Sequence, residues 1–232
     1  MSVGSGAAGS HPTPKQFLTL AGVPMLVRSL RAFLAVPRVA AIYVAVRKPE
    51  IDRVQAQIAE FGLSAKVHVL EGGDIRQQSV GNALAQLVAE TGCAEDVVVL
   101  VHDAARPLID PATIDRTIDA VLEHGAAIVG LPAVDTIKQV ERTAHGAIIT
   151  STIPREYVVQ AQTPQGFKLG LLKRVFAEAQ ADGFIGTDES SIAERAGVQV
   201  AVVPGTIENL KITQQGDLDL AEFFLLQREK LQ

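Results

Sequence analysis

The sequence predicts an α/β fold, in which a mostly parallel, twisted sheet is flanked by helices. Two observations predict it. Short apolar runs rich in β-branched residues recur along the chain, and amphipathic segments with a helical period separate them. Strands that are apolar on both faces are typical of buried parallel sheets, and their alternation with helices implies right-handed crossovers. The 232 residues are enough for one domain with a full hydrophobic core.

The expected elements follow in chain order. The strands are expected at Val39–Val46, Val67–Leu70, Val97–Val101, Ala126–Leu131 and Val198–Val203. The helices are expected at Ile51–Phe61, Ser79–Val88, Pro111–Leu122, Lys168–Gln180, Asp188–Ala196 and Asp217–Glu229. For the helix at Pro111, Asp110 is expected to be the N-cap and the proline to take the first helical position.

One stretch, from Ala133 to Gln162, breaks this alternation. Turn signals at His145–Gly146 and at Pro154 separate short runs that are typical of strands. These runs are Thr136–Val140, Ala147–Ser151 and Tyr157–Ala161. We therefore expect a hairpin-bearing excursion, which could either make dimer contacts or cover a site.

Composition excludes several classes of function. The net charge of −5 and the isoelectric point of about 5.6 argue against a general nucleic-acid binder. No apolar run is long enough to span a membrane, and the N-terminal residues do not have the pattern of a signal peptide. His and Cys show no metal-ligand spacing. The single cysteine, Cys93, allows no internal disulfide, which favours a reducing compartment such as the cytoplasm.

The clearest candidate for an active-site segment is Val97–Pro107, with the sequence VVVLVHDAARP. Ligands of open α/β sheets bind beyond the carboxyl ends of the strands, where this segment places Asp103 and Arg106. The carboxylate could meet a metal or a ribose hydroxyl, and the guanidinium could grip a phosphate. Alternatively, Asp103 only accepts hydrogen bonds from nearby backbone and Arg106 is solvated. We expect His102 to be structural.

Four further polar clusters carry weaker signals. The paired glycines in Glu71–Ser79 could let a ligand approach the backbone or could form a plain turn. The lysine in Pro14–Gln16 follows a Gly-rich stretch, which suits a phosphate. Thr187–Ser190 is expected to be a helix cap. The lysine in Asn209–Thr213 would by itself usually be solvated.

Seven segments taken together are similar to one family. They are Pro14–Pro24, Gly72–Ser79, Val101–Pro107, Asp135–Lys138, Gln162–Phe167, Thr187–Ser190 and Asn209–Thr213. In order and spacing they resemble 2-C-methyl-D-erythritol 4-phosphate cytidylyltransferases. The resemblance implies one Rossmann-like nucleotidyltransferase domain over residues 1–232, with a protruding β-arm over residues 133–162 that forms a homodimer. It implies a Mg²⁺-assisted reaction of CTP with methylerythritol 4-phosphate that gives the CDP-linked product and pyrophosphate.

The resemblance also implies roles for individual residues. The catalytic residues would be Lys15, Lys211 and Arg155, with Arg155 reaching across the dimer. The nucleotide would be bound by Gly73, Asp74, Ser79, Asp103 and Ala104. The acceptor substrate would be bound by Arg106, Thr136, Arg155, Thr163 and Thr187. The ligands of the metal are not indicated.

The chain departs from the family pattern at its beginning. Family members open with a buried strand and a loop of the type P-A-A-G-x-G-x-R before the P-K-Q segment. Here no strand precedes Lys15, and the first arginine is Arg28. We expect the true start codon to lie upstream of Met1, with Ser2–Thr13 as an enlarged loop tip. A chain that begins at Met1 would lack a central strand and expose the edges of two buried strands, with poor solubility and weak CTP turnover.

Three alternatives remain at this point. Ribitol-5-phosphate cytidylyltransferases share the fold and chemistry but use a different polyol phosphate. A truncated or non-catalytic relative would keep the fold and the arm. A dinucleotide-dependent oxidoreductase would need G-x-G-x-x-G directly after a strand, and no strand precedes the Gly-rich start.

Overall fold

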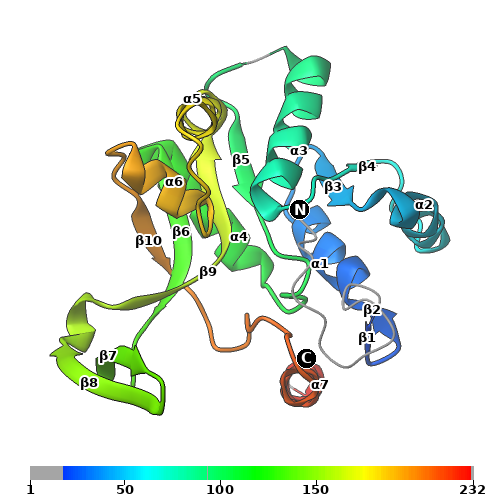
Figure 1. The fold of residues 1–232 in the computed structure, drawn as a ribbon. Coiled ribbons are helices and arrows are strands. Elements are labelled where there is room, and N and C mark those ends of the chain that lie inside the picture. Colours follow the sequence, from blue (N-terminus) through cyan, green and yellow to red (C-terminus); the bar gives the residue numbers. More distant parts are fainter. Residues whose placement is uncertain (1–17, 93, 231–232) are drawn as a thin grey trace.

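The computed structural model describes residues 18–92 and 94–230 and confirms the α/β fold class (Figure 1). The strands are β1 (Thr19–Leu20), β2 (Val23–Pro24), β3 (Ile42–Val46), β4 (Val67–Glu71), β5 (Val98–Val101), β6 (Ala126–Pro132), β7 (Ile137–Thr143), β8 (Gly146–Ile153), β9 (Val159–Lys168) and β10 (Ala201–Pro204). The α-helices are α1 (Met25–Leu34), α2 (Ile51–Glu60), α3 (Arg76–Thr91), α4 (Pro111–His124), α5 (Leu169–Ala181), α6 (Glu189–Arg195) and α7 (Gln215–Lys230). Two 3₁₀ turns, η2 (Lys48–Glu50) and η3 (Arg155–Tyr157), complete the order. Within the described residues, no helix is both long and apolar enough to cross a bilayer.

The larger sheet has the strand order β10-β6-β9-β5 and is mixed. β10 pairs with β6 in parallel, whereas β9 runs antiparallel to both β6 and β5. The short strand expected at Tyr157–Ala161 is therefore only the beginning of a longer one, which continues to Lys168. Its middle is polar yet buried, with Gln162, Thr163 and Gln165 in the interior, so apolar patterning could not reveal it.

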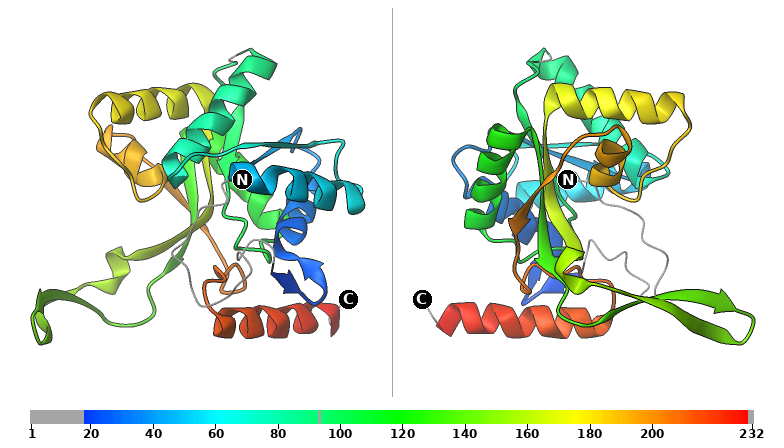
Figure 2. Two further views of the ribbon diagram at one scale, coloured as in Figure 1. Left: turned by 45° about the vertical axis from the view of Figure 1, so that its right-hand side comes forward. Right: turned by 90° about the vertical axis from the view of Figure 1, so that its left-hand side faces the viewer.

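Helices cover both faces of this sheet (Figure 2). On one face lies α4, whose Val121 packs against Ala127 of β6 and Val203 of β10. On the other face, α3, α5 and α6 form a second cluster around the fully buried Phe167 of β9. These layers give the sheet the two buried faces that its apolar strands require.

Local sequence signals explain where several helices begin and end. Asp110 caps α4 as predicted, accepting a hydrogen bond from the Thr113 backbone N–H at 2.8 Å, and Pro111 occupies the first helical position. Gly125 ends this helix with φ +84°, a conformation that glycine adopts without strain. Asp188 caps α6 in the same way as Asp110. α3 begins at Arg76, three residues before the expected Ser79.

The helix α1 was not among the expected elements. It follows the tight β1–β2 hairpin and buries Met25, Leu26, Leu30 and Phe33 along one side. The C-terminal helix α7 lies against the same end of the molecule, where Ala221 packs with Leu20 and Met25. These elements hold the β1–β2 hairpin at the edge of the sheet where β5 ends, because Leu108 belongs to the same cluster.

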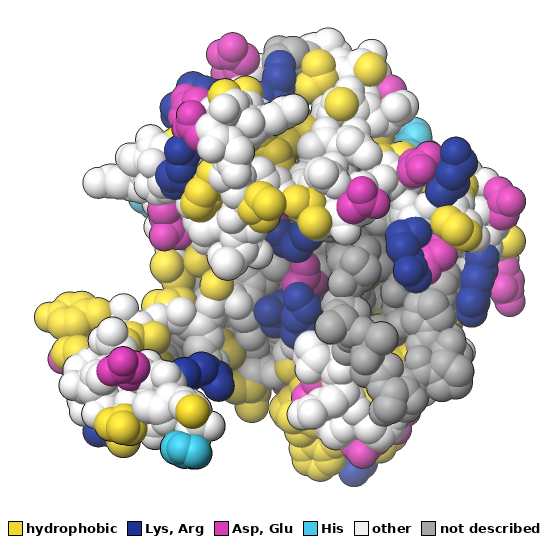
Figure 3. Space-filling view, viewed as in Figure 1, with side chains coloured by type: hydrophobic (Ala, Val, Ile, Leu, Met, Phe, Trp, Pro, Cys, Tyr) yellow, Lys and Arg dark blue, Asp and Glu magenta, His cyan; other side chains and the backbone are white. Residues whose placement is uncertain are grey.

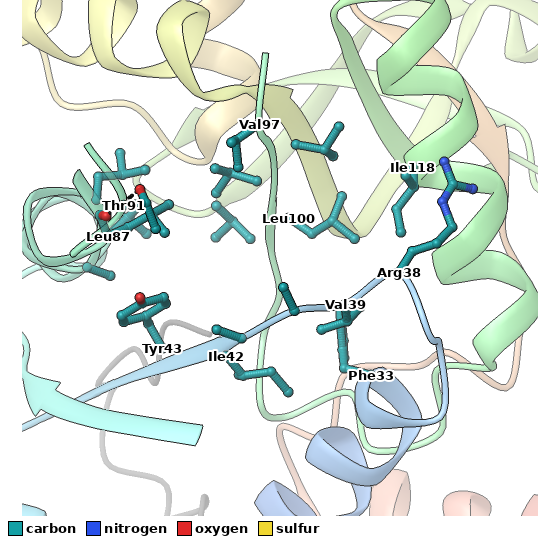
Figure 4. A pocket seen from close by; sticks show the side chains of 18 of the residues that line it. Phe33, Arg38, Val39, Ile42, Tyr43, Leu87, Thr91, Val97, Leu100 and Ile118 are labelled. Carbon is teal, nitrogen blue, oxygen red and sulfur yellow. Dashed lines mark hydrogen bonds between the residues drawn. The ribbon is translucent and has the colours of Figure 1, made fainter. Parts of the chain in front are cut away.

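The strands β3 and β4 form a separate parallel pair that does not join the larger sheet. Between β3 and β5 lies a cavity of about 520 Å³. Figure 4 shows Ile42 and Tyr43 of β3 on one side of the space and Val97 and Leu100 on the other. Among the described residues, β3 has no strand partner other than β4, and β5 has none other than β9.

The excursion after β6 forms a hairpin that projects from the body (Figures 1 and 2). We call residues 133–162 the arm. β7 and β8 pair antiparallel from Ile137 opposite Ile153 to Thr143 opposite Gly146, as the turn signal at His145–Gly146 predicts. Large apolar side chains are exposed along it: Val134, Val140, Ile148, Ile149, Ile153, Tyr157 and Val159.

Candidate active site

Asp103 follows the carboxyl end of β5 and gathers basic side chains from three segments. Its carboxylate Oδ2 lies 2.8 Å from Lys211 Nζ, and its Oδ1 lies 3.4 Å from Arg76 Nε. The Nε atom of Arg106 lies 4.0 Å from Oδ2. Figure 3 shows basic and acidic side chains meeting in the hollow at the centre of this face, between the arm and α7. A single carboxylate thus holds three cations at the mouth of the site.

These cations determine the charge of Asp103. Burial opposes ionisation of its carboxyl, but Arg76 and Lys211 outweigh burial and hold the pKa of Asp103 below its ordinary value. The carboxylate is therefore ionised at neutral pH. Burial also lowers the pKa of the Arg106 guanidinium, and Asp103 opposes that effect.

Arg76 joins this cluster to a second, deeper carboxylate. Its guanidinium Nη1 donates to Oε1 of Glu189, the first residue of α6, whose side chain is only 1% exposed. Burial raises the pKa of Glu189, and Arg76 is the counter-charge that opposes this rise. Burial also disfavours the charged form of Arg76, but Glu189 and Asp103 outweigh it and raise the pKa of Arg76. The two ion pairs that Arg76 makes, with Glu189 and with Asp103, fix the start of α3 against the carboxyl end of β5.

His102 is structural in this arrangement, as expected. It is fully buried, and its ring lies 5.0 Å from that of Phe33, centroid to centroid. The Thr163 hydroxyl accepts from the Asp103 backbone N–H at 3.0 Å, so its own hydrogen is directed at His102 Nδ1, 2.9 Å away. The other ring nitrogen, Nε2, then donates to the Arg106 carbonyl at 3.2 Å. A neutral imidazole ring therefore satisfies both contacts, with Nδ1 as acceptor and Nε2 as donor.

Burial lowers the pKa of His102 to about 3, which predicts a pH dependence of stability. The unfolded chain binds a proton near pH 6.5, whereas the folded ring stays neutral. The stabilisation is thus complete above pH 6.5 and is lost as the pH falls toward 3, by up to about 1.4 kcal/mol per pH unit. Urea unfolding between pH 7 and pH 4.5 should show that His102→Asn removes this slope. The matched variant His124→Asn, at a side chain 49% exposed, should keep it; equal slopes in the two variants would contradict the prediction.

The segment around Lys211 is fastened to the same strands. The Ile212 N–H donates to the Ala105 carbonyl at 2.8 Å, and Arg106 Nη1 donates to the Asn209 carbonyl at 2.8 Å. The buried Asn209 amide donates to the Thr163 carbonyl at 2.9 Å and to Gln162 Oε1 at 3.1 Å. Two buried atoms here, Arg106 Nε and Asn209 Oδ1, have no hydrogen-bond partner among the described residues. Such atoms are uncommon inside proteins and often mark a functional site.

A shift in β-pairing explains why Thr163 can reach this cluster. Gln165 of β9 is opposite Ile128 of β6, but Ala161 is opposite Gly130, so β9 carries two extra residues between the two pairs. Bulges of this kind redirect side chains next to active sites. Gln165 then binds the cap of α6, donating to Asp188 Oδ2 at 2.8 Å and accepting from the Ser190 N–H at 3.0 Å.

The glycine loop after β4 is closely packed against the start of α3. The Gly73 N–H donates to Ser79 Oγ at 3.0 Å, and the Asp74 N–H donates to Gln78 Oε1 at 2.9 Å. A Cβ on Gly73 would lie 2.3 Å from the Cβ of Gln78, so no larger residue fits without a shift. Because Arg76 follows directly, this loop and Asp103 border the same space.

The other expected site residues lie farther apart. Ala104 is buried beside Asp103, and Thr187 is exposed just before α6. Thr136 and Arg155 lie exposed on the arm, where Arg155 Nη1 donates to the Val134 carbonyl at 2.6 Å. Within the described part of the chain, no hydrogen bond or ion pair joins either of them to the Asp103 cluster. Lys15 and Cys93 lie outside the described residues.

Sequence reasoning missed several residues that build this site. Arg76 and Glu189 lie inside the segments that resemble the family, but nothing local showed that they pair over 113 positions of sequence. Gln77 was also missed: its side chain accepts from the Gly186 N–H at 3.0 Å and donates to the Phe184 carbonyl at 3.2 Å. The sequence did contain one signal for this site. Polar residues are dense directly after two predicted strands, and the carboxyl ends of parallel strands lie at the same edge of an α/β sheet.

Comparison with known proteins identifies the family. The family model described as 2-C-methyl-D-erythritol 4-phosphate cytidylyltransferase matches residues 1–227. The chain belongs to this cytidylyltransferase family. A relative of that name from Acidobacterium capsulatum is 67% identical over 224 residues, which are 96% of this chain and 92% of the relative. One from Solibacter usitatus is 47% identical over 96% of this chain and 90% of its own length.

Solved structures agree with this assignment to the cytidylyltransferase family. A 4-diphosphocytidyl-2C-methyl-D-erythritol synthase matches with a TM-score of 0.78 at 32% identity, covering 91% of this chain and 94% of its own. The 2-C-methyl-D-erythritol 4-phosphate cytidylyltransferase of Thermus thermophilus matches with a TM-score of 0.72, also at 32% identity, covering 94% and 95%. The fold and the order of the segments thus agree with those of the family.

Proposed function

We propose that this protein transfers the cytidylyl group of CTP to 2-C-methyl-D-erythritol 4-phosphate, releasing pyrophosphate, in isoprenoid precursor synthesis in the cytoplasm. The observation that carries the proposal is the Asp103 cluster. Three of the segments that resemble the family bring Arg76, Asp103 with Arg106, and Lys211 into one charged group. The 67% identity to a relative with this name supports the substrate.

The reaction requires charge neutralisation more than covalent chemistry. A phosphate oxygen of methylerythritol 4-phosphate attacks the α-phosphorus of CTP, and the bond from that phosphorus to the bridging oxygen of the β-phosphate breaks. The electron pair leaves with pyrophosphate. Two anions must approach, so fixed cations beside the reacting phosphates lower the barrier. Lys211, which is 47% exposed and held by Asp103, is in a position to serve this role. The family resemblance assigns the same role to Lys15, which lies outside the described residues.

Of the remaining residues, some would bind CTP and others would bind the polyol phosphate. Gly73, Asp74 and Ser79 would recognise the cytosine, as the family resemblance implies; the hydrogen bond from the Gly73 N–H to Ser79 Oγ fixes the shape of this loop. Asp103 and Ala104 would lie near the ribose. Arg106, Thr163 and Thr187 would contact the polyol phosphate, and the unpartnered Nε of Arg106 is a donor that such a ligand could use.

A Mg²⁺ ion fits this site if the substrate phosphates supply some of its ligands. The described residues contain no group of three His, Cys, Asp or Glu side chains that could hold a metal alone. Mg²⁺ is commonly held by one or two carboxylates together with substrate phosphates, and the ionised Asp103 is a carboxylate of that kind. When bound, the ion would supply positive charge to the triphosphate.

The arm supports a homodimer in which each arm serves the partner's site. Its large apolar side chains are exposed, for example Ile148 at 63% and Tyr157 at 84%, and exposed apolar patches often mark protein interfaces. Arg155 and Thr136 make no hydrogen bond or ion pair with the described residues of the Asp103 cluster in their own chain. A partner's arm would bring the second guanidinium to the acceptor phosphate.

Mixing two inactive variants tests this arrangement. Arg155→Ala and Lys211→Ala are each expected to lose most activity as homodimers. In a mixed dimer, one site combines the intact Lys211 of one chain with the intact Arg155 of the other, so activity should return to about a quarter of the parent value for a random mixture. If Arg155 acts within its own chain, no mixed dimer has a complete site. Activity that stays at the level of the separate variants would therefore contradict the proposal.

A pyrophosphate-release assay tests the function itself. The protein should be assayed using CTP with methylerythritol 4-phosphate or ribitol 5-phosphate. We expect it to prefer methylerythritol 4-phosphate. A preference for ribitol 5-phosphate would instead indicate the related cytidylyltransferase. CTP binding without turnover of either acceptor would indicate a non-catalytic relative.

A further inference from the structure

The first three residues of α3 hold three different segments of the site. Arg76 pairs with the two buried carboxylates described above. Gln78 closes the glycine loop, because its Oε1 accepts from the Asp74 N–H at 2.9 Å. Between them, Gln77 reaches the loop that joins α5 to α6, residues 182–188, which we call the α5–α6 loop. Successive side chains on an α-helix point in different directions, so these three neighbours act on separate segments.

The Gln77 side chain holds the α5–α6 loop through both polar atoms of its amide. Its Oε1 accepts from the Gly186 N–H at 3.0 Å, and its Nε2 donates to the Phe184 carbonyl at 3.2 Å. These two backbone groups flank Ile185, whose side chain is 68% exposed. A backbone N–H only donates and a carbonyl only accepts, so this pair of contacts requires a side chain that offers one acceptor and one donor.

The two halves of the α5–α6 loop are held in different ways. The first half is tied to its own helices, since Asp182 pairs with Arg195 of α6 at 2.5 Å. The second half is fitted closely at Gly186, where an added Cβ would lie 2.5 Å from Cγ1 of Ile192. The hydrogen bond from Gly186 to α3 therefore sets the backbone directly before Thr187.

Thr187 lies at the edge of the candidate site. It is exposed, and two residues later Glu189 binds Arg76, which in turn contacts Asp103. The α5–α6 loop thus borders the same cluster as the glycine loop. Separate hydrogen bonds fix the two loops, one from Gln77 and the other from Gln78.

We propose that Gln77 is a positioning residue for the acceptor substrate, which holds the α5–α6 loop so that Thr187 is placed for the polyol phosphate. This inference rests on the proposed function, in which Thr187 contacts that substrate. Without the two hydrogen bonds the loop would adopt several conformations. The apparent affinity for a ligand falls with the fraction of molecules in the binding-competent conformation, so the acceptor would bind more weakly while CTP would not.

Replacing Gln77 by methionine tests the proposal, because methionine is also unbranched but makes neither hydrogen bond. We expect the KM for methylerythritol 4-phosphate to rise about tenfold, with kcat and the KM for CTP within about twofold of the parent values. CTP binding should persist because Gln78 and Ser79 still close the glycine loop. Pyrophosphate release is measured with each substrate varied in turn at a saturating concentration of the other.

Two variants of the same helix provide matched controls. Gln78→Met should give the reverse pattern, a raised KM for CTP with the acceptor KM within about twofold, because it releases the glycine loop instead. Gln86→Met removes a hydrogen bond to Glu90 on the exposed side of α3 and should leave both constants within about twofold. A general weakening of the start of α3 would raise both KM values alike in Gln77→Met and in Gln78→Met.

Hydrogen exchange measures the loop without any substrate. The amides of residues 182–188 should exchange at least about fivefold faster in Gln77→Met than in the parent, and those of residues 72–79 should not change. Equal exchange of the loop, an unchanged acceptor KM, or equal increases in both KM values would overturn the inference. If the parent protein turns over neither acceptor, the proposed function fails, and the exchange comparison still decides whether Gln77 holds the loop.

Discussion

Replacing Arg76 by methionine is expected to lower the free energy of unfolding by about 3–5 kcal/mol. The side chain of Glu189 is only 1% exposed, and Arg76 is its counter-charge. Removing the guanidinium leaves a buried carboxylate without a partner, which costs more than the pair contributes. Urea unfolding of the parent and the variant at pH 7 measures the difference.

The dependence of this loss on pH identifies its cause. Burial raises the folded-state pKa of Glu189 above its unfolded value, and the loss of Arg76 raises it further. A group with a raised folded pKa favours folding at low pH and loses that contribution as the pH rises through the folded pKa. The deficit of Arg76→Met should therefore be larger at pH 8 than at pH 5. Adding Glu189→Gln should recover part of the stability; a double variant less stable than Arg76→Met would contradict this explanation.

Replacing Lys211 by alanine should lower kcat by about 10²–10³-fold. Removing one preorganised donor from a site of developing charge typically costs this much, about 2.7–4 kcal/mol of transition-state stabilisation. Stability should change little, because the lysine side chain is 47% exposed and such ion pairs contribute about 1 kcal/mol or less. Pyrophosphate release at saturating CTP and methylerythritol 4-phosphate measures the rate.

A lysine outside the site provides the control for this change. Lys48 is 78% exposed and lies 3.8 Å from Glu71, so Lys48→Ala removes a positive charge without touching the Asp103 cluster. Its kcat should stay within about twofold of the parent value, because single exposed charges act weakly across solvent. A Lys211→Ala rate equal to that of Lys48→Ala would show that Lys211 does not act on the reacting phosphates.

The sequence could predict much of this fold because its strands and caps are local features. The apolar runs around Val44 and Val99 and the cap at Asp110 need no distant partner to be recognised. The second half of β9 escaped recognition because its buried surface is polar: Gln162 and Thr163 are buried through hydrogen bonds to residues far along the chain. Period and hydropathy do not report that kind of burial.

The candidate site shows the same limit. Asp103 could be predicted from its place after a strand, because all carboxyl ends of parallel strands meet at one edge. The bond from Arg76 to Glu189 could not, since it depends on how α6 packs against α3. The roles of Thr136 and Arg155 stay predictions, because no hydrogen bond or ion pair joins either of them to the described residues of the Asp103 cluster.

The path of β9 gives the arm a mechanical connection to the site. The strand leaves the arm at Val159, opposite Pro132 of β6, and ends at Lys168, opposite Val98 of β5. Its irregular middle carries Thr163, whose hydroxyl holds the Asp103 backbone. One continuous backbone segment therefore joins the arm to the residue that holds the Asp103 carboxylate in place.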